Sequence, residues 1–143
     1  MSWSDKYMDI PFKAQGRDFN GCDCWGLKRL VWKEEKNILL PQYLGFYTNA
    51  DDTEAQTIAD RIKKETDTAD WISIPKGSEE PFDGMLISLK GIPCHVGIVV
   101  RKGRVLHITA GINSTVEDYR TNKWQVPGKI VGFYRNIALC KNL

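Results

Sequence analysis

The sequence lacks an apolar run long enough to span a bilayer, and its first five residues do not resemble a signal peptide. It also lacks a strong charge of either sign. The 20 Lys and Arg residues are interspersed among 18 Asp and Glu residues, for a formal net charge of +2. We therefore expect neither a membrane span nor a nucleic-acid partner. Repeats and low-complexity tracts are missing too, which predicts one domain over residues 1–143.

Cysteine and histidine are both scarce. Four cysteines without a signal sequence predict thiols that stay reduced in a cytoplasm, and they argue against a disulfide framework. The two histidines, His95 and His107, lie only twelve residues apart. Residues able to act as nucleophile, base or metal ligand are therefore few, and their positions carry most of the functional information.

The most informative stretch is 20–31, where a turn at Asn-Gly is followed at once by apolar residues at helical spacing. Asp23 is a good N-cap, which places Cys24 at the first helical position. The free N–H groups and the helix dipole there favour a thiolate, the nucleophilic form. Gly26 costs a helix about 1 kcal/mol relative to alanine, so we expect another segment to approach the helix closely beside Cys24. The helix should end near Lys36.

A free cysteine is, however, more often a small buried packing residue than a nucleophile. The rest of the chain must therefore supply the partners. The sequence predicts a short helix from Ser4 that stops before Pro11, a loop over 13–21, and a second helix whose start has capping-box spacing at 53–56. The apolar stripe of that second helix indicates structural packing and no chemistry.

From residue 71 onward the apolar period changes to that of strands. Helices followed by a meander of strands predict an α+β fold, in which an antiparallel sheet packs on the cysteine helix. The expected strands cover residues 71–74, 85–89, 94–100, 105–109, 115–118 and 130–134.

Both histidines lie in one predicted hairpin, and its turn decides whether they meet. A two-residue turn at 102–103 would place His95 and His107 on opposite faces of the sheet, because side chains alternate along a strand. A three-residue loop at 101–103 would place them on one face as diagonal neighbours, with backbone positions roughly 7–8 Å apart. We predict the three-residue loop, and with it a pair of histidines.

In the predicted register, Val100 pairs with Arg104 and Gly97 lies opposite His107. Gly103 falls where such a loop favours a left-handed residue. Gly97 would lie on the working face between the histidines, where a side chain would obstruct a substrate or a facing helix.

Taken singly, each histidine is more often a core or surface residue than a catalytic one. Taken together, Cys24, His95 and His107 give a thiol, a base and a third polar group to orient the base. That set is what nucleophilic thiol catalysis needs.

These residues resemble the NlpC/P60 family of papain-like cysteine peptidases, which cut bacterial cell-wall peptides. The resemblance extends from about residue 3 to residue 135. It is carried, in this order, by Asp-Cys-Trp-Gly-Leu at 23–27, Asp-Gly-Met-Leu at 83–86, His-Val-Gly-Ile at 95–98 and Val-Leu-His at 105–107.

The resemblance implies a papain-like fold, with the cysteine helix packed on an antiparallel sheet that bears the histidines. It implies that Cys24 is the nucleophile, that His95 is its base and then the acid for the leaving amine, and that His107 holds the His95 ring. Asp23 would help bind the free amine of the substrate. The substrate class would be a peptidoglycan stem peptide, cut at an amide next to D-glutamate, with no cofactor.

Trp25 stands where the family most often has serine, and it would flank the substrate together with Gly97. Trp25 and the Gly-Phe-Tyr-Arg ending at 132–135 are similar to a branch encoded among tailed-phage and prophage tail genes. This implies a hydrolase made in the bacterial cytoplasm, delivered by the virion tail and partnered by tail-tip proteins.

Three other interpretations stay open. Thiolate and imidazole groups suit zinc, although a Cys-x-Cys pair whose second member opens a helix is not the usual zinc spacing. The chain is alternatively an idle structural protein of a phage tail tip, or an acyltransferase that passes its acyl-thiol intermediate to an amine or alcohol. The residues that would supply a zinc site are Cys22, Cys24, Cys94, His95 and His107.

Overall fold

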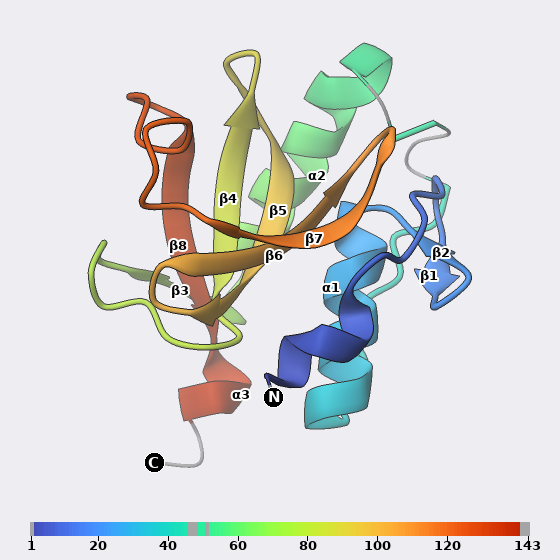
Figure 1. The fold of residues 1–143 in the computed structure, drawn as a ribbon, viewed down its shortest axis with the longest axis horizontal. Helices are drawn as coiled ribbons and strands as arrows, with labels where there is room; N and C mark the ends of the chain where they lie inside the picture. The colour runs from blue at the N-terminus through green and yellow to red at the C-terminus, as the bar shows by residue number, and fades with distance from the viewer. Residues whose placement is uncertain (1, 46–48, 51, 141–143) are drawn as a thin grey trace.

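The computed structural model describes residues 2–45, 49–50 and 52–140. Its centre is a six-stranded antiparallel sheet with strand order β3-β8-β4-β5-β6-β7 (Figure 1). The predicted strands are all present, most of them longer than expected. They are β3 Trp71–Ile74, β4 Gly84–Leu89, β5 Ile92–Arg101, β6 Arg104–Thr109, β7 Ile112–Asp118 and β8 Ile130–Asn136.

Two main helices precede the sheet in the chain and pack on one of its faces (Figure 1). This confirms the predicted α+β fold with the cysteine helix on an antiparallel sheet. The helices are α1 Cys24–Lys36 and α2 Ala55–Thr66; the smaller elements are 3-10 helices Trp3–Tyr7 and Asp52–Glu54, strands β1 Arg17–Asp18 and β2 Gly21–Cys22, and α3 Ile137–Cys140.

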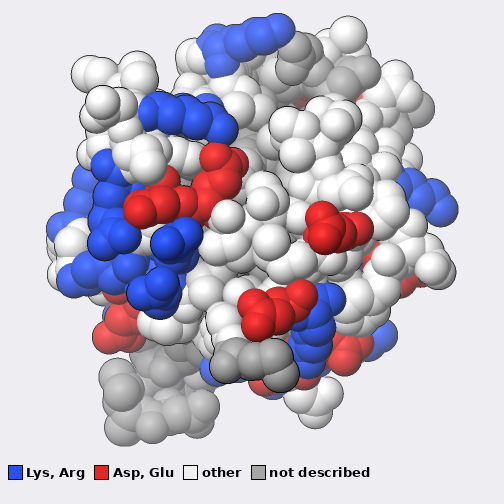
Figure 2. Space-filling model, viewed as in Figure 1, with Lys and Arg blue, Asp and Glu red and all other residues white. Residues whose placement is uncertain are grey.

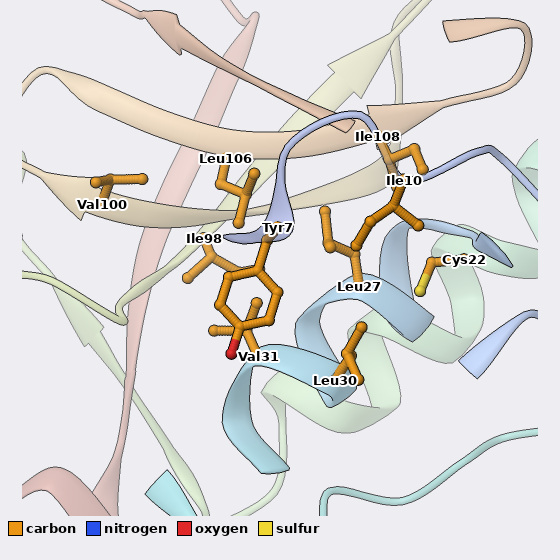
Figure 3. Close-up of a cluster of buried hydrophobic side chains, with 10 residues drawn as sticks. All are labelled: Tyr7, Ile10, Cys22, Leu27, Leu30, Val31, Ile98, Val100, Leu106 and Ile108. Carbon is orange, nitrogen blue, oxygen red and sulfur yellow. The ribbon is translucent and has the colours of Figure 1, made fainter. Parts of the chain in front are cut away.

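The apolar stripe of α1 packs against the middle of the sheet. Leu27 and Val31 are buried against Ile98 of β5 and Leu106 of β6, and Figure 3 shows these side chains gathered between helix and strands. Each such fully buried side chain stabilises the fold by about 1.5–3 kcal/mol. The helix ends at Asn37, whose left-handed φ of 54° closes its last turn where the sequence predicted.

The opposite face of the sheet is covered by the connection between β7 and β8. Tyr119 and Trp124 of this connection pack on a buried cluster that includes Met85, Val105 and Phe133. The sheet therefore has the helices on one face and the 119–129 connection on the other. Because alternate residues of β5 and β6 point to opposite faces, this second layer forms part of the surroundings of the two histidines.

The β5–β6 hairpin differs in detail from the prediction. Arg101 pairs directly with Arg104, so the loop has two residues and the predicted three-residue loop is wrong. An irregularity in β5 between Val99 and Arg101 takes up one residue, and Val99 then pairs with Val105. This restores the register that the longer loop would have given. Gly103 has the expected left-handed conformation, with φ of 96°.

The start of α2 also differs. The helix begins at Ala55, and the predicted capping box at 53–56 is wrong, because no side chain caps the helix. Instead the Glu54 carboxylate accepts hydrogen bonds from the backbone N–H groups of Asn49 and Ala50. Those bonds hold the preceding loop against the helix start.

The N-terminal region contains the short helix expected from Ser4, as a single 3-10 segment that ends before Pro11. The loop predicted over 13–21 contains the β1–β2 hairpin, in which Arg17 pairs with Cys22. This hairpin lies beside the start of α1.

Surface charge on the face seen in Figure 2 is mixed. Positive and negative side chains are interspersed at one side of that face, and the rest is mainly uncharged. Surface ion pairs include Arg120–Asp118 and Lys123–Glu117, each at 2.9 Å. Within the described part of the chain, no helix is both long and apolar enough to cross a membrane.

Candidate active site

Cys24 is the first residue of α1, as predicted, and Asp23 is the N-cap. The Asp23 Oδ1 atom accepts the Gly26 N–H at 2.8 Å. The Cys24 side chain packs against a buried cluster that includes Val96 of β5, so the thiol lies between the start of the helix and the strand that carries His95. The backbone N–H groups of Trp25 and Val96 act to lower the pKa of this thiol.

Gly26 allows another segment to approach α1 closely, as its unfavourable helix propensity predicted. A Cβ atom at this position would overlap the backbone carbonyl oxygen of Gly16 in the loop before β1. Only glycine allows the β1–β2 region to lie this close to the first turn of α1.

The Asp23 carboxylate is buried, with 1% exposure, and its hydrogen bonds are to other groups of the protein. Besides the cap, it accepts the Arg17 Nη1–H at 2.9 Å and the Gln15 N–H at 2.8 Å. Both oxygens are thus engaged in fastening residues 15–17 to the helix start. A substrate amine would have to share this carboxylate with Arg17.

His95 and His107 meet on neighbouring strands, which confirms the predicted pair. His95 Nε2 lies 3.1 Å from His107 Nδ1, and both rings are buried, with 3% and 9% exposure. The ring planes are steeply inclined to one another, with centroids 5.3 Å apart. This contact engages Nε2 of His95, whereas its Nδ1 takes no part in it.

Glu117 of β7 completes a row of side chains that the sequence analysis missed. Its Oε2 lies 2.5 Å from His107 Nε2, while its Oε1 accepts the Lys123 ammonium at 2.9 Å. Trp124 packs edge-on against the His107 ring, with centroids 5.3 Å apart. The available signal was strand alternation, because His107 pairs with Thr115 and Glu117 is two residues further along the same face.

Cys24 and His95 line one cleft, with a volume of about 150 Å³, hereafter the cleft. One wall comes from Trp25 and Tyr43, whose rings lie 5.4 Å apart. The Trp25 indole is fixed by its Nε1–H, which donates to the Pro41 carbonyl at 2.6 Å. Trp25 thus lies beside the nucleophile as predicted.

Helix α2, which the sequence predicted to serve packing alone, also lines the cleft, and its Arg61 and Glu65 contact Tyr43. Glu65 is buried there and accepts the Tyr43 hydroxyl and, at 2.9 Å, the Trp71 indole N–H. The Arg61 guanidinium lies over the Tyr43 ring, 4.2 Å from its centroid. The cleft wall therefore carries one cation and one anion in fixed positions.

A second hollow of about 150 Å³ lies beyond the histidines and is lined by His107, Glu117, Lys123 and Lys129, among others. It shares part of its lining with the cleft, so the two hollows adjoin at His95. The shared residues are Leu89, His95, Ile108 and Thr109.

Burial decides the protonation of the catalytic pair. It raises the pKa of Cys24 to about 12, with a further rise from the Asp23 charge, and the two N–H groups at the sulfur offset only part of this. Burial likewise lowers the pKa of His95 to about 3, helped by the neighbouring charges of His107 and Lys129. Both shifts favour a neutral thiol and a neutral imidazole, so burial outweighs the bias toward thiolate that the helix start was predicted to give.

Gly97 lies beside His107, on the face where it was predicted, but it is not among the residues that line the cleft. A Cβ atom there would lie 2.6 Å from Val105 Cγ2 and 3.5 Å from the Cβ of His107. The glycine therefore leaves room for β6 to carry His107 close to β5.

Three of the four thiols belong to the described side chains, and none of the three is in a disulfide. Cys22, Cys24 and Cys94 are free, and the described residues contain no group of three or more His, Cys, Asp or Glu placed to hold a metal ion. The Cys22 thiol is buried and donates to the Asp18 carbonyl at 3.1 Å, whereas Cys94 lines the cleft. Cys22 is thus a packing thiol, as expected.

A half-buried thiol at a helix start shares a cleft with one of two paired histidines, an arrangement typical of cysteine-dependent hydrolases. The family model of the NlpC/P60 family matches residues 9–131, and the chain belongs to that family of cysteine-dependent peptidoglycan hydrolases. No curated relative shows significant sequence similarity to it.

Solved structures of the same family share the fold. The NlpC/p60 domain of the peptidoglycan hydrolase SagA aligns with a TM-score of 0.54 at 20% identity, over 80% of this chain and 82% of that one. A lipoprotein-like member from Staphylococcus aureus gives 0.60 at 20% identity, covering 92% and 38% of the two chains. A member from Bacillus cereus gives 0.62 at 16% identity, covering 91% and 36%, so this chain spans well under half of these two.

Proposed function

We propose that this protein is a cysteine peptidase that hydrolyses peptidoglycan stem peptides, at the amide next to D-glutamate, through an acyl-thiol intermediate. The observation that carries the proposal is the placement of Cys24 and His95 in one cleft, with His107 bonded to the far side of the His95 ring.

Attack begins from the neutral pair. As the Cys24 sulfur attacks the scissile carbonyl carbon, His95 Nδ1 takes the thiol proton, so the charges form only during the reaction. The developing oxyanion lies at the start of α1, where the backbone N–H of Cys24 and the helix dipole favour negative charge. His107 stabilises the resulting imidazolium by accepting the His95 Nε2–H.

Collapse of the tetrahedral intermediate breaks the C–N bond, and His95 returns its proton to the leaving amine. The acyl group then stays on Cys24 as a thioester. Water attacks this thioester with His95 again as base, and the thiol is restored. Each proton that His95 takes up is given back within the cycle, so no external acid is required.

The cleft suits a short peptide with charges of both signs. Arg61 and Glu65 place opposite charges on its α2 wall, while Trp25 and Tyr43 offer aromatic surface. A stem peptide has a free amine and carboxylates at close spacing, which is complementary to such walls. Asp23, also in the lining, would contribute to amine binding by sharing its carboxylate with Arg17.

The test is digestion of purified wall fragments, with products identified by mass spectrometry. Wild type should release fragments cut next to D-glutamate, and Cys24→Ala and His95→Ala should each lose at least about 10²-fold in rate while staying folded. Cys22→Ala, which removes a thiol two residues earlier, is the matched control and should cleave normally.

The same digest separates the alternatives. Fragments joined to an added amine or alcohol would make the protein an acyltransferase. No cleavage of any wall fragment by folded wild type would contradict the proposal and favour an idle structural role.

We also propose that a phage tail delivers this hydrolase to the wall. The support is the likeness of Trp25 and the 132–135 ending to the tail-associated branch. In purified virions of the encoding phage or prophage, the protein should be detected by mass spectrometry with the tail-tip proteins. Its absence from tails would contradict this proposal and leave the hydrolase proposal intact.

A further inference from the structure

We propose that Glu117 is a positioning residue of the site, which sets the tautomers of both histidines so that His95 presents an unprotonated Nδ1 to Cys24. The role follows from a row of side chains across three strands: His95 on β5, His107 on β6 and Glu117 on β7.

The proton positions follow from the end of the row. An ionised Glu117 only accepts hydrogen bonds, so the His107 nitrogen facing it, Nε2, must carry the proton. In a neutral His107 the other nitrogen, Nδ1, is then an acceptor. The proton between the two rings must therefore belong to His95 Nε2, at 3.1 Å, which leaves His95 Nδ1 with a lone pair.

Glu117 is kept ionised by its own partners. Burial raises its pKa, but hydrogen bonds from Lys123 and His107 outweigh this and lower the pKa to about 2. The Trp124 indole N–H reaches the same oxygen as Lys123, at 3.4 Å. The 119–129 connection thus holds the carboxylate in place, so its acceptor atom points to His107.

The row works only while His107 is neutral. A charged His107 would donate from both nitrogens, and His95 would then have to keep its proton on Nδ1, the wrong atom for a base. Burial lowers the pKa of His107 against the opposing effect of Glu117, and the charges of Lys123 and Lys129 act in the same direction as burial. Lys123 therefore offsets part of the effect of the Glu117 charge, which raises the pKa of His107.

The chain itself makes the test clean, because His95 and His107 are its only histidines. In ¹⁵N-histidine-labelled protein at neutral pH, long-range ¹H–¹⁵N spectra should show two neutral rings, each protonated on Nε2. A wild-type spectrum with the His95 proton on Nδ1, or with a charged His107, would overturn the proposal.

Removing the Glu117 carboxylate should weaken the preference of both histidines for the proton on Nε2. In Glu117→Ala both rings should become tautomer mixtures. In Glu117→Gln, whose side-chain amide can also donate, the preference should weaken, and this variant serves if the alanine variant fails to fold. Asp118→Asn, a charge loss at the neighbouring position of β7, is the matched control and should leave both rings unchanged. Unchanged tautomers in both Glu117 variants would overturn the proposal.

The kinetic consequence rests on the proposed function. For wall-peptide hydrolysis, Glu117→Gln should lower kcat by about tenfold to 100-fold, because part of the base catalysis by His95 is lost, and should leave KM nearly unchanged. The NMR result needs no substrate. Predicted tautomers in a protein that cleaves nothing would therefore contradict the proposed function and not the role of Glu117.

Discussion

Two carboxylates flank the site, and they differ in their burial and in their partners. Asp23, on the helix side, is almost fully buried and accepts three hydrogen bonds from its own neighbourhood. Glu117, on the sheet side, is partly exposed and reaches the thiol only through two imidazole rings. The helix side fixes the nucleophile by backbone geometry, whereas the sheet side fixes the proton acceptor by a row of side chains. Changes on the first side should therefore appear in stability, and changes on the second in protonation and rate.

The largest stability effect should come from Asp23→Ala. It removes the N-cap and leaves the Arg17 guanidinium without its buried carboxylate, so unfolding should become easier by about 2–4 kcal/mol. Asp23→Asn keeps a capping oxygen and should lose less. Urea unfolding of the three proteins checks this. A loss below about 0.5 kcal/mol in the alanine variant would show that the helix side is not organised by this carboxylate.

The second-largest effect should be the pH dependence of the free energy of unfolding, which depends on the two histidines of the sheet side. Burial holds the pKa of His95 near 3, and that of His107 below its usual range, so the unfolded chain binds protons more readily. The contribution of the histidines to stability should be constant above about pH 7 and fall as the pH drops through 6.5, by up to about 1.4 kcal/mol per pH unit for each histidine.

Between pH 6.5 and 5 the two histidines should dominate this slope, because histidine is the side chain whose ordinary pKa lies in this range. Urea unfolding at pH 7, 6 and 5 measures it, and His95→Gln should remove about half. A flat profile in wild type would mean that the two rings are not buried in the neutral form. It would contradict the distinction drawn between the helix side and the sheet side.

Lys28 should give the smallest effect. Its ammonium is buried in α1 over the Trp71 ring, and burial lowers its pKa to about 8. The nearby acids have other partners, since Asp83 is paired with Arg135 and Glu65 accepts the Trp71 indole N–H.

Lys28→Met should therefore leave the free energy of unfolding within about 1 kcal/mol of wild type, or raise it. Thermal unfolding at pH 7 provides the measurement, with the exposed Lys64→Met as control. A loss of more than about 2 kcal/mol would show that Lys28 is a structural partner of those acids.

What the sequence predicted well was local or periodic. The Asp23 cap, the start of the helix at Cys24 and the close approach at Gly26 depend on neighbours within one turn. The meeting of His95 and His107 was predicted from strand alternation together with a three-residue loop. The prediction held although the loop was wrong, because an irregularity in β5 took up the extra residue.

What the sequence did not predict depends on distant parts of the chain. Glu117 reaches His107 only through the β6–β7 register, and α2 becomes a cleft wall only when it packs beside β5. The neutral state of Cys24 results from burial by several segments, which outweighs the local effect of the helix start. Local residue spacing does not indicate which strands pair, and it does not indicate how deeply a thiol is buried.

The central claim is that Cys24 carries the acyl group during hydrolysis. The direct measurement mixes the protein with a purified stem peptide, quenches with acid at times from milliseconds to minutes, and determines intact mass and adduct position by mass spectrometry. We expect a transient adduct with the mass of the acyl fragment on Cys24, and none in Cys24→Ala. Product release without any adduct on Cys24, or an adduct on another residue, would contradict the account.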